Sequence, residues 1–279
     1  MSSRPSSALR SALSRSRKGP RMATSLVAGL ALTSLFLSPP AASAAESPID
    51  LDLYGKLLDE HTRVVDDLAA TRVDYRSLRK STDWKRVVDQ VLAAKTSRIS
   101  RDEKLAFWIN AYNILAIDLI VRHYPIDGIK ELGSFFSPVW DLEVATIAGR
   151  EVSLGGIEHD ILRKMDEPFI HGAIVCASAS CPPLARTPFR PDHLREDLAA
   201  AMRNWLRHRQ KGIALDKVAK VIHLSKVFDW FEEDFESRGG VLEAIADLLP
   251  PEDAAWIRQE AGNASIRYFD YDWSLNDLR

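Results

Sequence analysis

The sequence has very little cysteine: only Cys176 and Cys181 occur in 279 residues. This excludes a scaffold held by several disulfides, and the C-x-x-C and H-E-x-x-H spacings that are typical of zinc sites are also absent. A P-loop, a G-x-G-x-x-G fingerprint and a serine-centred G-x-S-x-G turn are missing too, which argues against the nucleotide-binding and serine-hydrolase classes that carry them. We therefore predict no cofactor.

Acidic residues are missing from the first 44 residues, which instead contain six basic ones. An apolar stretch over 23–37 follows all six, and Ala42-Ser43-Ala44 has the A-x-A form of a cleavage site. This pattern predicts a secretory signal peptide over 1–44, cleaved near Ala44, and a secreted or periplasmic protein. The alternative is an uncleaved N-terminal anchor, but the apolar stretch is short for a membrane span and no second one supports it.

Without the leader, 31 basic residues face 39 acidic ones, which gives a net charge of −8. A net-negative domain argues against nucleic acid as a partner. The 235 residues after the leader fit one domain with one core, and we predict no membrane span in them. We divide them into an N-terminal helix or extension over 45–69 and a main domain over 70–279, and we expect a small-molecule or peptide substrate as the partner.

A long helix over 100–124 is the central structural prediction. Ser100 and Glu103 form an S-x-x-E capping box at its start, and Pro125 ends it. The helix is apolar on nearly all sides, so we expect it to be buried at the centre of the domain. Asn110 and Asn113 share one face of this helix and either bind neighbouring backbone or line a polar cleft.

Shorter elements are predicted before and after this helix. Hydrophobic periodicity predicts helices over 51–65, 84–94 (capped by Asp83), 157–165, 192–208, 227–235, 241–249 and 251–261. Apolar runs and turn signals predict a hairpin over 143–154 and strands over 169–176, 220–225 and 266–270. This layout indicates an α+β fold, with a helical N-terminal part around the long buried helix, packed on a small, mostly antiparallel sheet.

The two cysteines lie at and just beyond the end of the predicted strand over 169–176. An extended chain would put their Cα atoms about 16 Å apart, too far for a disulfide, whereas a chain that turns back would allow one. A thiol nucleophile needs a base within about 3 Å and a third group that orients this base. The candidate nucleophiles are Cys176 and Cys181, the candidate bases are His171 and His159, and the candidate orienting residues are Glu158 and Asn110.

A regular strand would turn His171 away from Cys176, so only a bend would bring the imidazole to a cysteine. The alternative is a structural pair of cysteines beside a buried histidine. A zinc site made of His171, Cys176 and Cys181 would need a fourth ligand from far away in the sequence, so we predict no metal. Asp270 and Asp272 in the tail either pin a terminal strand by local hydrogen bonds or form a polar wall of the cleft.

Five different motifs follow one another along the chain. They are Ala106-Phe107-Trp108-Ile109-Asn110-Ala111-Tyr112-Asn113, Ile157-Glu158-His159 with Leu162-Arg163, His171 to Leu184, Leu224 to Phe231 with Asp234-Phe235, and Asp270-Tyr271-Asp272-Trp273-Ser274-Leu275-Asn276. Together they resemble the DUF547 family of domains of unknown function over about 70–276. Gly172 departs from the family pattern, which often has a bulky residue after the histidine.

The resemblance indicates an exported, bacterial-type member of this family but implies little about activity. A set of Glu, His, Cys and Asn is similar, by analogy, to papain-type or transglutaminase-type cysteine chemistry in a different chain order. We therefore predict a cysteine-dependent hydrolase or acyltransferase that acts on an amide or thioester bond. The alternative is a non-catalytic binding or scaffold domain in which Cys176 and Cys181 form a structural disulfide.

Overall fold

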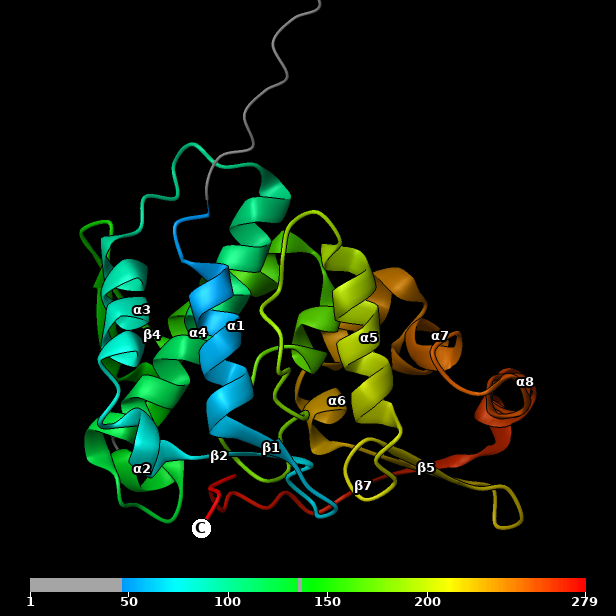
Figure 1. Cartoon of the computed structure of the whole chain (residues 1–279). Helices are drawn as coiled ribbons and strands as arrows, with labels where there is room; N and C mark the ends of the chain where they lie inside the picture. The colour runs from blue at the N-terminus through cyan, green and yellow to red at the C-terminus, as the bar shows by residue number, and fades with distance from the viewer. Residues whose placement is uncertain (1–46, 135–136) are drawn as a thin grey trace, which may run out of the picture. The chain divides into compact units, whose positions relative to one another are not determined.

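The computed structural model describes residues 47–134 and 137–279, so the signal peptide predicted over 1–44 lies outside the described residues. In the described part, helices are combined with three small sheets (Figure 1). This confirms the predicted α+β class, although the strands are divided among three sheets instead of forming one.

The longest helix, α4 (Arg101–His123), is buried in the core. Its start has the predicted capping box, because Ser100 Oγ accepts from the N–H of Glu103 and the Glu103 carboxylate accepts from the N–H of Ser100. Among the elements that pack against it are α2 (Tyr75–Leu78), α3 (Thr82–Ala93) and the π-helical turn η3 (Gly156–Leu162). Among the described helices α4 alone is long and apolar enough to cross a membrane, and 89% of that stretch is buried inside the protein.

The N-terminal helix is shorter than predicted. Helix α1 (Leu51–His61) ends where β1 (Thr62–Val64) begins, because these residues pair antiparallel with β2 (Thr71–Val73). The predicted cap of the next helix was also wrong, since Ser81, rather than Asp83, accepts a hydrogen bond from the N–H of Trp84.

The predicted hairpin over 143–154 is confirmed as β3 (Glu143–Ile147) and β4 (Arg150–Ser153). Its two-residue turn, Ala148-Gly149, has positive φ at both positions, as a turn that follows the twist of the strands requires. The third sheet has the order β5 (Ile213–Asp216), β6 (Val221–Leu224) and β7 (Ser265–Tyr268), with β6 and β7 parallel. Strand β5 was not predicted.

Several predicted helices are divided into shorter ones. The remaining elements are η1 (Ile129–Leu132), η2 (Val139–Asp141), η4 (Arg163–Met165), α5 (Leu194–Leu206), α6 (Lys226–Trp230), η6 (Glu232–Arg238), α7 (Val241–Ala246), α8 (Pro251–Glu260) and η7 (Ala261–Asn263).

Helix α5 explains the glycine at position 172, because a Cβ there would lie 3.1 Å from the Cα of Met202.

The predicted strand over 169–176 was wrong. Residues Pro168–Gly172 form a 3-10 helix, η5, in which the carbonyl of Ile170 accepts from the N–H groups of Ala173 and Ile174. The following residues run as an irregular buried segment. The segment is apolar because it is buried. A buried strand and a buried irregular segment are equally apolar, so the hydrophobicity of the sequence could not distinguish them.

The buried asparagines of α4 bind neighbouring backbone. The amide of Asn110 donates to the carbonyl of Phe189 (2.8 Å) and accepts from the N–H of the same residue (3.0 Å). Asn113 donates to the carbonyl of Ala173 (2.9 Å) and accepts from the N–H of Val175 (2.8 Å). Each side chain thus replaces the pairing that a strand neighbour would have given to an irregular segment.

The substitution Asn110→Ala is expected to lower the free energy of unfolding by about 2–4 kcal/mol, because it leaves a buried N–H and a buried carbonyl of Phe189 without partners. Urea unfolding measures this change. The matched control is Asn263→Ala at an exposed asparagine, which should change the value by less than about 0.5 kcal/mol. Equal effects of both substitutions would contradict this role of Asn110.

Candidate functional site

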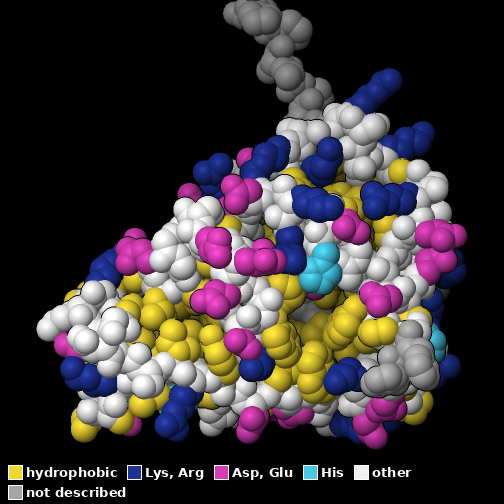
Figure 2. Space-filling view, turned by 180° about the vertical axis from the view of Figure 1, so that it is seen from behind, with side chains coloured by type: hydrophobic (Ala, Val, Ile, Leu, Met, Phe, Trp, Pro, Cys, Tyr) yellow, Lys and Arg dark blue, Asp and Glu magenta, His cyan; other side chains and the backbone are white. Residues whose placement is uncertain are grey.

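A cavity of about 430 Å³ opens between α4, η2, η3, α6 and the segments that carry the cysteines and the C-terminal tail. Figure 2 shows a hollow of this kind, flanked by hydrophobic side chains with a histidine and acidic groups nearby. The cavity is lined by Tyr112, Pro138, Trp140, Asp141, Gly155, Glu158, His159, His171, Ile174, Cys176, Cys181, Pro182, Val227, Trp230, Phe231, Tyr271 and Trp273. Five of the six predicted site residues therefore lie around one cavity, and Asn110 lies away from it.

His171 is oriented by an acidic residue that the sequence analysis did not select. Its Nε2 lies 2.7 Å from Asp234 Oδ2, and Arg163 donates to both oxygens of the same carboxylate. Burial acts to raise the pKa of Asp234, but the hydrogen bonds from His171 and Arg163 hold it far below its usual range. Because this carboxylate is ionised, Nε2 of His171 carries the proton and Nδ1 presents a lone pair.

Glu158 faces this lone pair. Its Oε1 lies 3.7 Å from Nδ1 of His171, which has no hydrogen-bond partner among the described residues. Burial raises the pKa of Glu158 to about 7, and the nearby Asp234 charge adds to this, although Arg163 acts in the opposite direction. Burial lowers the pKa of His171, so the imidazole is neutral. The cavity thus contains a carboxyl group that exchanges its proton near neutral pH, with a neutral imidazole behind it.

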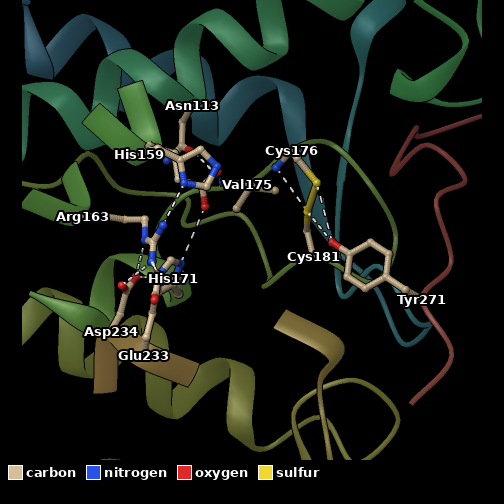
Figure 3. A network of polar contacts seen from close by, with 11 residues as sticks. Asn113, His159, Arg163, His171, Val175, Cys176, Cys181, Glu233, Asp234 and Tyr271 are labelled. Atoms are coloured by element: carbon tan, nitrogen blue, oxygen red, sulfur yellow. Dashed lines mark hydrogen bonds and ion pairs between the residues drawn. A yellow bond between two sulfur atoms is a disulfide. The ribbon is translucent and has the colours of Figure 1, made fainter. Parts of the chain in front are cut away.

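His159, the other predicted base, lies at the exposed edge of this group. Its Nδ1 is 3.0 Å from a terminal nitrogen of Arg163, and its ring lies 5.9 Å from that of Phe231. Figure 3 shows both histidines beside Arg163, apart from the disulfide and Tyr271. The described contacts of His159 therefore join it to Arg163 rather than to a sulfur atom.

Cys176 and Cys181 form a disulfide with their Cα atoms 6.5 Å apart, which is the alternative that the sequence analysis left open. The chain turns back between the two cysteines, as this alternative requires. Ala177 has a φ of 66°, and the N–H of Cys181 donates to the carbonyl of Ser178 (3.1 Å). The hydroxyl of Tyr271 lies 3.2 Å from Cys181 Sγ and 3.7 Å from Cys176 Sγ, so both sulfurs contact the same phenol.

The C-terminal tail holds the turn between the cysteines in place. The carbonyl of Ser274 accepts from the N–H of Ala179, and the carbonyl of Asp272 accepts from that of Ser180. Ser180 Oγ in turn accepts from the N–H of Asp272 (2.9 Å). The tail therefore binds through its backbone and places Tyr271 and Trp273 at the cavity. The alternation of aromatic and polar residues in the tail was the one sequence signal for this arrangement.

A buried lysine also binds the backbone of this turn. Lys211 is 2% exposed, and its ammonium donates to the carbonyls of Ala69 (2.9 Å), Ala179 (3.1 Å) and Cys181 (2.7 Å). Burial lowers the pKa of Lys211 to about 7. No sequence signal marked this role, because a lysine in a polar loop is usually exposed to solvent.

Metal-ligating side chains are not gathered at this site. Over residues 47–134 and 137–279, no group of three His, Cys, Asp or Glu side chains is arranged to hold a metal ion. The polar groups that line the cavity are suited instead to proton transfer and to hydrogen bonding.

The comparison with known families supports the resemblance given by the motifs. The model of the family described as "Protein of unknown function, DUF547" matches residues 96–206. This range contains α4, Glu158, both histidines and both cysteines, and it ends before Asp234 and Tyr271. No curated protein and no solved structure matches the chain. The likeness to papain-type or transglutaminase-type enzymes stays a prediction.

The substitution Lys211→Met is expected to lower the free energy of unfolding by about 2–4 kcal/mol, because three buried carbonyls lose their donor. Guanidinium unfolding measures the change. Lys85→Met is the matched control, since its ammonium is exposed and pairs only with Asp89. A Lys211→Met protein as stable as this control would show that the three contacts contribute little.

Glu158→Gln tests the proton held by the buried carboxyl. The pKa of Glu158 is raised from 4.5 to about 7, so the folded state retains a proton that the unfolded state loses, and the wild type loses stability as pH rises through this range. The amide has no such proton. Glu158→Gln should therefore gain roughly 3 kcal/mol relative to wild type between pH 4.5 and pH 8. Urea unfolding at several pH values measures this, with Glu196→Gln as the exposed control, and a pH-independent difference would contradict it.

Proposed function

We propose that this domain is a hydrolase or acyltransferase that acts on an amide or thioester bond, with Glu158 as the group that accepts and returns the proton. The observation that carries the proposal is the position of Glu158: its carboxyl lines a cavity large enough for a small organic group, and burial raises its pKa to about 7. A base with a pKa close to the working pH is the most effective in general catalysis.

The reaction would begin with a water molecule beside the ionised Glu158. The carboxylate takes one proton of this water while the oxygen adds to the carbonyl carbon of the substrate. The protonated Glu158 then gives the proton to the departing nitrogen or sulfur as its bond to carbon breaks. The Nδ1 atom of the neutral His171 lies 3.7 Å from Glu158 Oε1, so a closer approach would let it accept a hydrogen bond from the protonated carboxyl, with Asp234 holding the ring from the other side.

Tyr271 is suited to stabilise the oxygen of the tetrahedral intermediate. Burial, together with the nearby charge of Glu158, raises the pKa of its phenol, so the hydroxyl keeps its proton and is a donor at neutral pH. Its described partners are the two sulfur atoms, which are weak acceptors, so the proton remains available for a developing oxyanion.

A second candidate is the thiol route that the sequence suggested. It is favoured by one observation, namely that both sulfurs of the disulfide line the cavity and contact Tyr271. A dithiol reductant would convert the disulfide into two thiols and would itself become a disulfide. The thiol of Cys176, which is the more exposed cysteine, would then pass its proton to Glu158 and attack the carbonyl carbon in place of water. The bond from this carbon to nitrogen or sulfur would break, the amine or thiol would leave with the proton from Glu158, and an acyl-enzyme would remain.

Export is part of the proposal. It is supported by the leader pattern over 1–44 and by the disulfide, because disulfides persist in oxidising compartments. N-terminal sequencing of the protein recovered outside the cytoplasm of an expressing bacterium should give a chain that starts at Ala45. A chain that keeps Met1 or stays in the cytoplasm would contradict export.

The activity test uses a panel of chromogenic amides, thioesters and esters with the protein in its disulfide form. The value of kcat/KM should rise with pH through about 7, and Glu158→Gln should lower it by about 100-fold or more, because the base is lost. Glu196→Gln is the control that should keep full activity. Turnover that does not depend on Glu158 would overturn the proposed role.

The same panel separates the two routes and the non-catalytic alternative. The water route predicts that a variant with Ala at both Cys176 and Cys181 keeps its activity, and that a dithiol does not raise it. The thiol route predicts activity only after reduction and its loss in Cys176→Ala. Ligand binding without turnover under either condition would favour a binding domain with a structural disulfide.

A further inference from the structure

Four aromatic side chains form a continuous surface at the cavity: Trp140, Trp230, Tyr271 and Trp273. The ring of Trp273 lies 4.4 Å from that of Tyr271, 5.7 Å from that of Trp230 and 5.9 Å from that of Trp140, measured between centroids. None of the four is fully buried, and Trp230 is 43% exposed. Large aromatic groups that line an open cavity and remain accessible are typical of a binding surface rather than of a core.

The cavity lining carries no fixed positive charge, although Lys130 lies at the aromatic surface. The ionisable groups that line the cavity include two carboxyls, Asp141 and Glu158, but no lysine or arginine. Asp141 is exposed and directly follows Trp140. His171 is held neutral by its burial. A cavity with aromatic faces and a carboxylate at its edge attracts positive charge and repels anions.

The surface already holds one cation of the protein itself. The ammonium of Lys130 lies 4.7 Å from the ring centroid of Trp273. This lysine is exposed. The indole ring of Trp273 therefore already accepts one cation at its face in this structure.

From these contacts we infer that the cavity recognises a ligand with a cationic nitrogen, an alkylammonium or a guanidinium, whose charge lies between the four aromatic rings and Asp141. The inference rests on the proposed function only for the position of the bond that reacts. This bond would lie beside Glu158, and the cationic nitrogen of the same substrate would lie close to it. A substrate of this class is an amide or thioester with an amine or guanidine near its carbonyl carbon. Binding of the cation itself requires no catalysis.

Choline and its neutral isostere 3,3-dimethyl-1-butanol test the inference, because the two differ at one atom, which is a cationic nitrogen in choline and a neutral carbon in the alcohol. Calorimetric titration of the wild type at pH 6, where Glu158 is mostly protonated, should give a millimolar dissociation constant for choline. The neutral alcohol should bind at least about fivefold more weakly, as expected for the loss of a cation–π contact and a carboxylate. Added salt should weaken only the binding of choline.

Two variants and their control locate the site. Asp141→Asn and Trp273→Leu should each weaken choline binding by about fivefold, whereas Trp256→Leu on α8 should leave it unchanged. Circular dichroism checks that each variant is folded. Equal affinity for choline and the neutral alcohol, or no binding of choline in the millimolar range, would overturn the inference, and the wild-type titration alone decides this if a variant fails to fold.

The Glu158→Gln protein separates this inference from the proposed function. It should bind choline as the wild type does at pH 6 while it lacks turnover. Retained choline binding with full turnover would overturn the role of Glu158 and leave the cation site standing. Loss of the discrimination between choline and the alcohol would overturn the cation site and leave the role of Glu158 standing.

Discussion

The site depends on how α4 binds the irregular segment beside it. The segment over 173–175 has no strand partner, yet it is buried, so its backbone groups need other partners. Asn113 supplies two of them, with Ala173 and Val175, and Asn110 does the same for Phe189. A rigid, capped helix thereby fixes a chain that carries both His171 and Cys176, which is what a preorganised site requires.

The turn between the cysteines is fixed from two further sides. Lys211 binds the carbonyls of Ala179 and Cys181, and the C-terminal tail pairs with the backbone of the same turn. The disulfide closes it covalently. The sulfurs therefore form part of the wall of a preformed cavity, and Tyr271 reaches this wall because the tail that carries it is held by the turn.

The two halves of the cavity have different physical properties. On one side, burial keeps His171 neutral and brings the proton of Glu158 into the neutral pH range, while Arg163 stabilises the ionised Asp234. On the other side, accessible aromatic rings and the exposed Asp141 favour positive charge. Such a division would let one side bind a substrate while the other exchanges a proton with it.

The sequence by itself determined the elements whose signals are local. The capping box and all-round hydrophobicity of α4, the hairpin turn at Gly149 and the α+β class follow from spacing and residue type. The five site residues at the cavity were also selected from the sequence. Only the tertiary structure decided the disulfide, the partnership of His171 with Asp234 and the burial of Lys211, because these depend on contacts between residues 5, 63 and up to 142 positions apart. A hydrophobic run reports that a segment is buried, whereas its partners are set by the packing of the whole chain.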